Sequence, residues 1–344
     1  MTSNHRPLAA GADLCEVGNE ALIPFEEVED MQKTKGRGSL PAVGFVGLGA
    51  MGRPMASRLL ANGYPLTAYD IVPAATERLA SAGAQAATSP EAVAEASDVI
   101  VSMLPDSPDV QAAVLGSGGI LAGMRESAVL IDMSTISPAV TRQVAEAVTA
   151  AGRRMLDVPV GRTPRHAAEG DLLLMAGGDP DLLEEVGPIL RCFGKDLVHC
   201  GPVGSGAIMK LVNNLLGASI LAADAEALVL GVAAGLELET VLAVLRSTGA
   251  SNTHLRSTYP EKALRRDLSP GFATRLAIKD VRLALELASE VRLPIGVGAA
   301  ALQLFNAAAA EGHENDDYTS VLAVLERYGK VELHERPAPN ERRP

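Results

Sequence analysis

The sequence predicts an α/β protein in which a doubly wound parallel sheet is followed by an all-α domain, the two joined by one long helix. The chain has 344 residues, which exceeds one domain at about 100 to 200 residues per domain. From residue 41 to about residue 201, short apolar runs alternate with helical segments, as in the βαβ units that build a parallel sheet. Beyond residue 204 only helical patterns follow.

The strands are expected where apolar residues run uninterrupted for about 4 to 8 positions. These runs cover residues 42–47, 65–70, 98–104, 127–133, 153–160, 171–178 and 195–200. Amphipathic helices are expected between them, for example over residues 51–63 and 138–150. The sheet domain is therefore placed at residues 41–203, after an extension over residues 1–40 that we expect to be disordered.

A helix of nearly thirty residues is expected over residues 206–235, about 45 Å long. Part of it is apolar enough to suggest a membrane span, but Asp224 and Glu226 would each cost about 2.5 to 3.5 kcal/mol there. We therefore expect a buried helix and no membrane partner. Further helices are expected over residues 239–246, 259–265, 272–290, 296–311 and 318–328. They complete an all-α domain at residues 204–330, followed by a flexible tail at residues 331–344.

Composition and charge exclude several classes of function. The 42 acidic residues outnumber the 30 basic ones, and the net charge of −12 opposes binding to a phosphate backbone, so no nucleic-acid partner is expected. The three cysteines form no C-x-x-C pair and the six histidines no H-E-x-x-H motif, so neither disulfides nor a metal site are expected. The first forty residues lack the apolar run of a secretory signal, which predicts a cytoplasmic protein.

A glycine-rich turn lies between the first strand and the helix after it. Its G-x-G-x-x-G pattern makes a tight turn, lets the backbone approach a pyrophosphate and allows close helix packing. Asp70 ends the next strand, where a carboxylate can accept hydrogen bonds from the adenosine ribose. This predicts a Rossmann-type dinucleotide site, and Asp70 without an arginine at positions 71 and 72 favours NAD over NADP. The expected cofactor-binding residues are Gly47, Leu48, Gly49, Ala50, Met51, Gly52 and Asp70.

The long helix opens with the polar element Gly204-x-Gly206-x-x-x-Lys210-x-x-Asn213-Asn214. Lys210 and Asn213 are three positions apart and share a helix face. A lysine beside a nicotinamide can give a proton to a carbonyl oxygen as hydride reaches the carbon. We expect Lys210 and Asn213 in catalysis, with Asn213 and Asn214 also at the substrate. A lysine that extends along the surface is the structural alternative.

A second loop, over residues 157–163, follows a strand at the edge where ligands of parallel sheets collect. Arg162 offers a planar fork for an anionic group, and Thr163 and the amide of Gly161 add donors. These three are the expected substrate residues of the loop. A surface loop with an incidental arginine is the alternative.

The remaining candidate site residues follow other predicted strands or lie in the helix expected over residues 272–290. Lys279 lies in the helix after Phe272, where it is expected to reach the cofactor or the active site, unless it is a solvated charge. Thr135 is assigned to both the substrate and the cofactor. The further expected cofactor-site residues are Met103, Leu104, Pro105, Thr135, Phe272 and Lys279.

Residues 45–59, F-V-G-L-G-A-M-G-R-P-M-A-S-R-L, resemble the signature of the β-hydroxyacid dehydrogenases, the family that includes 3-hydroxyisobutyrate dehydrogenase. The resemblance runs from about residue 41 to residue 328 and includes the Lys210-x-x-Asn213-Asn214 element. It implies a Rossmann domain followed by a helical domain, an NAD-dependent dehydrogenase with its catalytic lysine at Lys210, and a homodimer or homotetramer assembled through the helical domain.

The substrate loop departs from the usual D-x-P-V-S-G-G of the family, in which backbone amides hold a carboxylate. Gly161-Arg162-Thr163 resembles the loop of members that act on 3-sulfolactaldehyde, and an arginine suits the three oxygens of a sulfonate. We expect interconversion of 3-sulfolactaldehyde and 2,3-dihydroxypropane-1-sulfonate. One alternative is a carboxylate substrate such as succinic semialdehyde or a 3-hydroxyisobutyrate-type acid. Another is a non-catalytic dinucleotide-binding protein, against which the presence of Lys210 argues.

Overall fold

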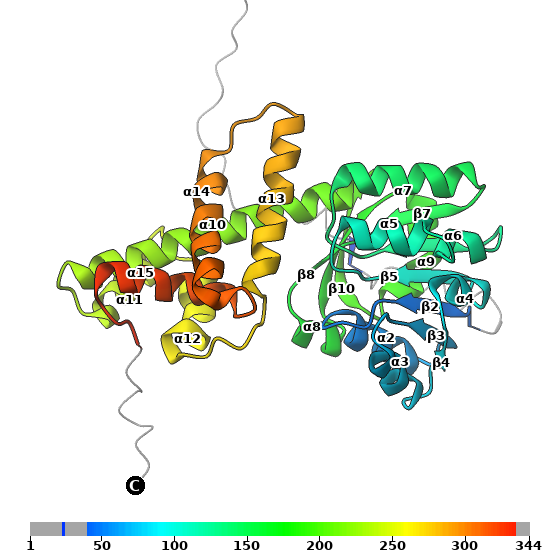
Figure 1. Ribbon diagram of the computed structural model, residues 1–344, viewed down its shortest axis with the longest axis horizontal. Helices are drawn as coiled ribbons and strands as arrows, with labels where there is room; N and C mark the ends of the chain where they lie inside the picture. Colours follow the sequence, from blue (N-terminus) through cyan, green and yellow to red (C-terminus); the bar gives the residue numbers. More distant parts are fainter. Residues whose placement is uncertain (1–22, 25–39, 335–344) are drawn as a thin grey trace, which may run out of the picture.

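The computed structural model describes residues 23–24 and 40–334 of the chain. A sheet flanked by helices lies at one end of the molecule and a group of helices at the other, and α10 (Ser205–Ala233) runs from one to the other (Figure 1). The predicted fold class, a parallel α/β sheet followed by a helical region with a long connecting helix, is confirmed.

The strands are β1 (Ile23–Pro24), β2 (Val43–Val46), β3 (Leu66–Tyr69), β4 (Gln85–Ala86), β5 (Val99–Ser102), β6 (Val129–Asp132), β7 (Arg154–Asp157), β8 (Val160–Gly161), β9 (Leu172–Gly177) and β10 (Gly194–Gly201). Across the described residues they form one sheet in the order β1-β10-β9-β7-β6-β5-β2-β3-β4, with β8 paired to β9. The strands from β4 to β7 in this order are parallel, whereas β9 runs antiparallel to β7.

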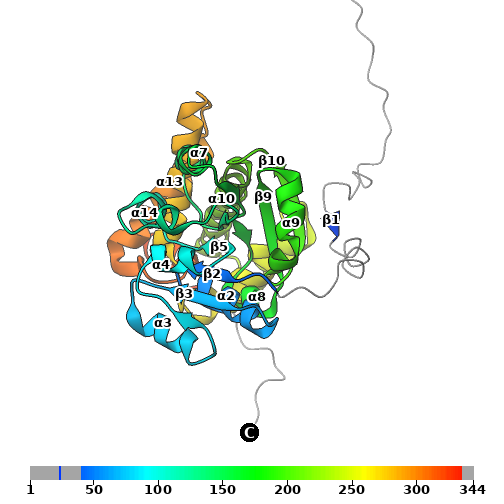
Figure 2. The ribbon, with the colours of Figure 1, turned by 90° about the vertical axis from the view of Figure 1, so that its right-hand side faces the viewer.

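Helices cover both faces of this sheet (Figure 2). They are α2 (Gly52–Ala61), α3 (Pro73–Ala80), α4 (Pro90–Glu95), α5 (Ser107–Leu115), α6 (Ile120–Gly123), α7 (Pro138–Ala150), α8 (Pro164–Glu169) and α9 (Pro180–Leu190). Phe45 of β2 packs in one core with residues of α2 and α9, and the next residue, Val46, packs in a second core with α4 and α7. Burial of both faces explains why the strands appear in the sequence as continuous apolar runs.

The strand order reverses at β2. The chain passes from β2 to β3 and β4 on one side, then returns to β5 on the other side of β2. Ligands of doubly wound sheets bind at the carboxyl ends of the strands where this reversal occurs. Gly47, after β2, and Met103, after β5, therefore flank the expected ligand crevice.

The helical region contains α11 (Leu238–Ser247), α12 (Tyr259–Glu261), α13 (Thr274–Glu290), α14 (Gly296–Ala308) and α15 (Val321–Gly329). Leu221 of α10, Val281 of α13, Phe305 of α14 and Leu322 of α15 share one buried core. The helix expected over residues 259–265 is instead divided into α12 and a short 3₁₀ turn, Ala263–Arg265. The division falls at Lys262, where the backbone leaves the helical region with a φ of −116° and a ψ of −103°, whereas Pro260 lies in the first turn of α12, where proline is tolerated.

By length and composition alone, α10 is apolar enough to cross a membrane, with a mean hydropathy of 1.8 over an 18-residue window. Core helices of globular domains meet the same test. Here α10 packs along α13, α14 and α15, and its charged Asp224 is buried within the helical region.

Two expectations concern the ends of the chain. The disordered extension predicted over residues 1–40 lies largely outside the described residues, but Ile23–Pro24 forms β1, which pairs antiparallel with β10 at Asp196 and Leu197. The flexible tail predicted over residues 331–344 is described only to residue 334. In this part Leu333 is buried in the helical core and its backbone amide donates to Glu326.

Candidate active site

The glycine-rich turn connects β2 to α2 and has the shape that a pyrophosphate requires. Gly47 has a φ of +97°, and a Cβ there would collide with the carbonyl of Met103. A Cβ on Gly52 would collide with the carbonyl of Gly47, so these two glycines allow close packing. A Cβ on Gly49 would meet no protein atom within 4 Å, and α2 begins without a side-chain cap at Met51. An open backbone facing uncapped helix amides fits the phosphates of a dinucleotide.

Asp70 lies directly beside this turn. Its Oδ2 accepts a hydrogen bond from the amide of Leu48 at 2.6 Å, and its Oδ1 accepts from the amide of Val72 at 2.8 Å. Ile71 and Val72 are exposed. The carboxylate is therefore placed where the ribose of a bound dinucleotide would lie, with no basic side chain at the next two positions.

A buried carboxylate organises the neighbouring strand ends. Asp132 of β6 accepts hydrogen bonds from the hydroxyls of Ser102, at 2.8 Å, and Ser134, at 2.6 Å. Ser134 in turn accepts from the amide of Leu104 at 2.9 Å. Burial raises the pKa of Asp132, and the serine hydrogen bonds oppose that rise. The segments that carry Met103, Leu104 and Pro105 after β5 and Thr135 after β6 are thus fixed side by side at the carboxyl edge.

Lys210 is buried in the first turns of α10, with only 9% of its surface exposed. Burial lowers the pKa of its ammonium group, Asp280 opposes that change and Lys279 adds to it. A lysine with a lowered pKa can exchange its proton at moderate pH, which suits general acid and base chemistry. The surface alternative for Lys210 therefore does not hold.

Asp280 of α13 joins the polar residues of α10 to the sheet domain. Its Oδ2 accepts a hydrogen bond from Nδ2 of Asn214 at 2.6 Å, and its Oδ1 lies 3.1 Å from Nζ of Lys279. Lys279 also donates to the backbone carbonyl of Thr135, so it is buried between the two regions and is not a solvated charge. Asn213 donates to Asn214 at 3.0 Å.

Asp280 is a site residue that the sequence pattern indicates only through its place on a helix face. The residue lies on the apolar face of α13 with Ala277, Val281 and Ala284, where a carboxylate is rarely left without a partner.

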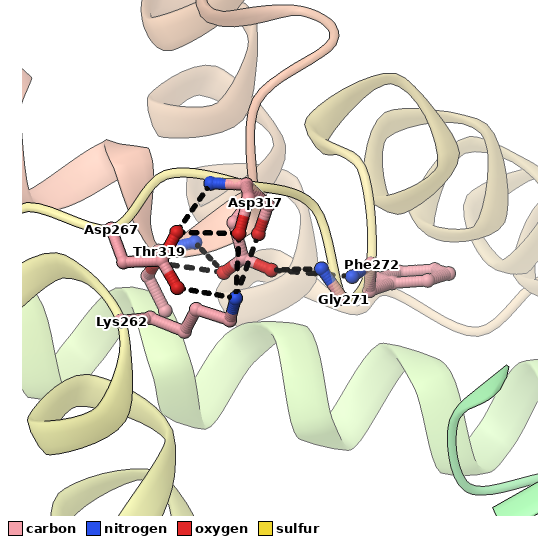
Figure 3. A network of polar contacts seen from close by, with 7 residues as sticks. Lys262, Asp267, Gly271, Phe272, Asp317 and Thr319 are labelled. Carbon is pink, nitrogen blue, oxygen red and sulfur yellow. Dashed lines mark hydrogen bonds and ion pairs between the residues drawn. The ribbon is translucent and has the colours of Figure 1, made fainter. Parts of the chain in front are cut away.

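Phe272 is held by a network of polar contacts just before α13 (Figure 3). The carboxylate of Asp317 accepts from the amides of Gly271, at 2.9 Å, and Phe272, at 3.2 Å. Lys262 donates to Asp267 at 2.9 Å and so fixes the start of the same segment. The ring of Phe272 stands edge-on to Tyr318, with centroids 5.4 Å apart. The network fixes the segment that leads into the helix carrying Lys279 and Asp280.

The loop over residues 157–163 extends beyond the carboxyl end of β7. Asp157 pairs with Gly177 at the end of β9, whereas Gly161 pairs with Leu173 near its start, so β8 continues the line of β7 outward. β8 lies on the side of the sheet domain that faces the helical region (Figure 1). The structure thus places Gly161, Arg162 and Thr163 at the expected edge.

The side chain of Arg162, however, already has anionic partners. Its guanidinium lies 2.6 Å from the carboxylate of Asp196 and 3.1 Å from that of Asp171. Its backbone has a φ of +77°, which is uncommon for a residue other than glycine. The structure does not bring the guanidinium into contact with Lys210, Asn213 or Asn214, because two acids from the starts of β9 and β10 hold it. Thr163 pairs with His166 at 2.8 Å.

Among residues 23–24 and 40–334, no group of three or more His, Cys, Asp or Glu side chains is placed to hold a metal ion. In the same ranges Cys192 and Cys200 are free thiols, and Cys15 lies outside them.

Two protein-family models match the chain, one over the sheet region and one over the helical region. Residues 42–201 match the model for the NAD binding domain of 6-phosphogluconate dehydrogenase. Residues 204–325 match the model for the NAD-binding region of NADP-dependent 3-hydroxyisobutyrate dehydrogenase.

Individual relatives agree with the family models. The chain is 38% identical to 3-sulfolactaldehyde reductase of Escherichia coli, over 82% of this chain and 95% of that protein. It is 36% identical to NAD-dependent L-serine dehydrogenase of Pseudomonas aeruginosa, over 83% and 97%. A solved structure of 3-hydroxyisobutyrate dehydrogenase of Mycobacterium tuberculosis with L-serine superposes with a TM-score of 0.78, at 30% identity over 83% of this chain and 99% of that one. The chain therefore belongs to the β-hydroxyacid dehydrogenase family, that of 3-hydroxyisobutyrate dehydrogenase, and is an NAD(P)-dependent dehydrogenase that acts on a CH–OH group.

Proposed function

We propose that this dehydrogenase interconverts 3-sulfolactaldehyde and 2,3-dihydroxypropane-1-sulfonate, with NAD as its cofactor and Lys210 as the group that exchanges the proton. The observation that carries the chemistry is the cluster of buried Lys210 and Asp280 with partly buried Asn214 and Lys279. The substrate is proposed from the 38% identity to the Escherichia coli reductase and from the Gly161-Arg162-Thr163 loop.

A dinucleotide held at the glycine-rich turn and Asp70 would supply the hydride that aldehyde reduction needs at the carbonyl carbon. Lys210 then gives its proton to the carbonyl oxygen, so the product is a neutral alcohol and the lysine is left neutral. Asn213 and Asn214 orient the oxygen and the ammonium group, because they lie on the same helix and Asn214 is fixed by Asp280 at 2.6 Å. In alcohol oxidation the neutral lysine takes the proton back.

The sulfonate is proposed to bind at the loop over residues 161–163, through its backbone amides, the hydroxyl of Thr163 and Arg162. Because Asp171 and Asp196 hold the guanidinium, Arg162 would bind the substrate anion only by exchanging one of these carboxylates. In that exchange one singly charged anion replaces another, so the guanidinium keeps an anionic partner throughout.

NAD is proposed over NADP because Asp70 would repel a 2′-phosphate and the exposed Ile71 and Val72 offer no cationic group to hold one. The Pseudomonas aeruginosa relative is by name NAD-dependent, which supports this choice. Assembly into a homodimer or homotetramer is also proposed. Ile208, Val212 and Leu216 are exposed at four-residue intervals on α10, as on a helix face that meets another subunit.

The second candidate is a carboxylate substrate such as succinic semialdehyde or a 3-hydroxyisobutyrate-type acid. One observation favours it: the guanidinium of Arg162 is occupied, and backbone amides alone suffice for a carboxylate. A non-catalytic dinucleotide-binding protein is less well supported, because Lys210 is present and buried beside Asp280.

The test is NADH oxidation by the purified protein with 3-sulfolactaldehyde beside succinic semialdehyde, repeated with NADPH and with the Arg162→Ser and Lys210→Ala variants. The proposal expects a sulfonate preference that collapses in Arg162→Ser and turnover that is lost in Lys210→Ala. Equal or better turnover of the carboxylate would reject the sulfonate substrate. Near wild-type turnover by Lys210→Ala would reject the proton role of that lysine.

A further inference from the structure

Asp157, the last residue of β7, makes an unusual long-range contact with α10. Its Oδ1 accepts a hydrogen bond from the amide of Gly204 at 2.7 Å, and its Oδ2 accepts from the amide of Ala207 at 2.8 Å. Gly204 is the N-cap residue of α10, has a φ of +93° and carries no side chain with which to cap the helix. The cap that a helix normally takes from its own N-terminal side chain therefore comes from a strand 47 positions earlier in the chain.

The first turn of α10 also packs against the strands without any intervening side chain. A Cβ on Gly206 would collide with the carbonyl of Met175 and would lie 2.8 Å from the carbonyl of Asp157. A Cβ on Gly177 would collide with Oδ1 of Asp157 and would lie 2.9 Å from the amide of Gly206. The two glycines let α10 approach β7 and β9 closely enough for the carboxylate to reach both amides.

Asp157 thereby touches both parts of the proposed active site. On one side it begins the loop over residues 157–163, which is proposed to hold the substrate anion. On the other side it holds Ala207, and Lys210 follows Ala207 by about one helical turn on the same α10. We infer that Asp157 is a positioning residue that fixes the distance between the substrate loop and Lys210. The inference rests on the proposed function, since it takes Lys210 as the proton donor and this loop as the anion site.

The charge of Asp157 matters for this role. An ionised carboxylate accepts strongly from both amides, whereas protonation turns one oxygen into a hydroxyl, which is a weaker acceptor for the amide that faces it. The titratable groups that face it are Asp132 of β6 and Cys200 of β10, while α10 presents the two amides. Burial raises the pKa of Asp157 to about 6, Asp132 adds to the rise and the two amides oppose it. Positioning should therefore weaken as the pH falls through about 6.

The experiment compares Asp157→Asn with Asp179→Asn in the full-length enzyme. Asp179 is a matched control because it is also a helix-capping aspartate but caps its own helix, α9, through the amide of Asp181 at 2.8 Å. Steady-state kcat and KM are measured from pH 5 to 9 with the better of the two aldehydes, and NADH affinity by fluorescence titration. Asp157→Asn should lower kcat about 10- to 100-fold, the effect of a misplacement near 1 Å, while the Kd for NADH changes less than about threefold.

The pH dependence separates positioning from general damage. The wild-type enzyme should lose kcat below about pH 6, and Asp157→Asn, which has no proton to gain, should lack that acidic limb. A second variant, Gly206→Ala, keeps the carboxylate but forces α10 away from β9, so it should lower kcat and retain the limb. The Gly206→Ala variant tests the positioning role if Asp157→Asn does not fold.

The inference is overturned if Asp157→Asn keeps kcat within about twofold of the wild type with its acidic limb in place, or if Gly206→Ala is fully active. If either result is found while Lys210→Ala is inactive, the positioning role of Asp157 is rejected and the proposed function is retained. An active Lys210→Ala would instead remove the proposed function itself.

Discussion

Replacing Asp280 with asparagine should shift the pH range of catalysis. The carboxylate is almost completely buried, lies 3.1 Å from Nζ of Lys279 and raises the pKa of Lys210 against the effect of burial. A nearby opposite charge favours the charged form of an ammonium group. In Asp280→Asn that support is lost, so the pKa of Lys210 should fall further below its usual value. Because aldehyde reduction needs protonated Lys210, the alkaline limb of kcat/KM should move to lower pH.

The stability cost of this substitution should be smaller than that of a truncation. Removing one partner of a buried ion pair costs about 3 to 5 kcal/mol when the other charge is left unpaired. Asparagine retains an oxygen that can accept from Asn214, and Lys279 keeps its hydrogen bond to the carbonyl of Thr135. We therefore expect a loss at or below about 3 kcal/mol, measured by urea unfolding.

The assay is the pH profile of NADH oxidation from pH 6 to 10, with Glu286→Gln as the control. Glu286 lies on the same α13 but is exposed and pairs with Arg282 at 3.7 Å, so its loss should leave the profile in place. An alkaline limb that is unmoved in Asp280→Asn would refute the reasoning, because it would mean that this carboxylate does not stabilise the charged form of Lys210.

Two further predictions follow from single positions. Gly49→Val should weaken NADH binding at least about tenfold in a fluorescence titration while the melting temperature stays unchanged, because its Cβ meets no protein atom but occupies the space proposed for the pyrophosphate. Asp224→Asn should stabilise the protein by about 1 to 3 kcal/mol at pH 7.5 and by almost nothing near pH 4. Burial raises the pKa of Asp224 to about 6 and its Oδ2 has no partner, so the folded state favours the neutral form and loses stability as the pH rises through 6. Equal melting temperatures of the two proteins at pH 7.5 would contradict this.

The fold could be predicted because its signals are local. Strands buried on both faces appear as apolar runs, the reversal at β2 follows from the βαβ order, and the glycines at 47 and 52 are needed where backbone meets backbone. The helix over residues 206–235 differs from α10 by only one or two residues at each end.

The polar partners of the site could not be predicted in the same way, because they come from distant parts of the chain. The sequence predicts that Arg162 binds an anionic group, and only the pairing of β8 with β9 and of β9 with β10 reveals Asp171 and Asp196 beside it. Asp157 lies in the predicted substrate loop, yet its role at α10 depends on a contact across 47 positions. Asp280 acquires its partners only when α13 packs against α10.

Three buried carboxylates at the carboxyl edge each fix a different part of the candidate active site. Asp132 orders the strand ends that flank the dinucleotide, Asp157 caps α10, and Asp280 fixes Asn214 and Lys279. In each case the carboxylate oxygens accept hydrogen bonds, which the ionised form does best. Burial raises the pKa of Asp132 and Asp157 and lowers the pKa of Lys210. The pH range in which the carboxylates are ionised while Lys210 is protonated is therefore narrowed from both sides. The enzyme should therefore reduce its substrate over a bounded pH range, limited on the acid side by protonation of Asp157 and on the alkaline side by deprotonation of the lysine that delivers the proton.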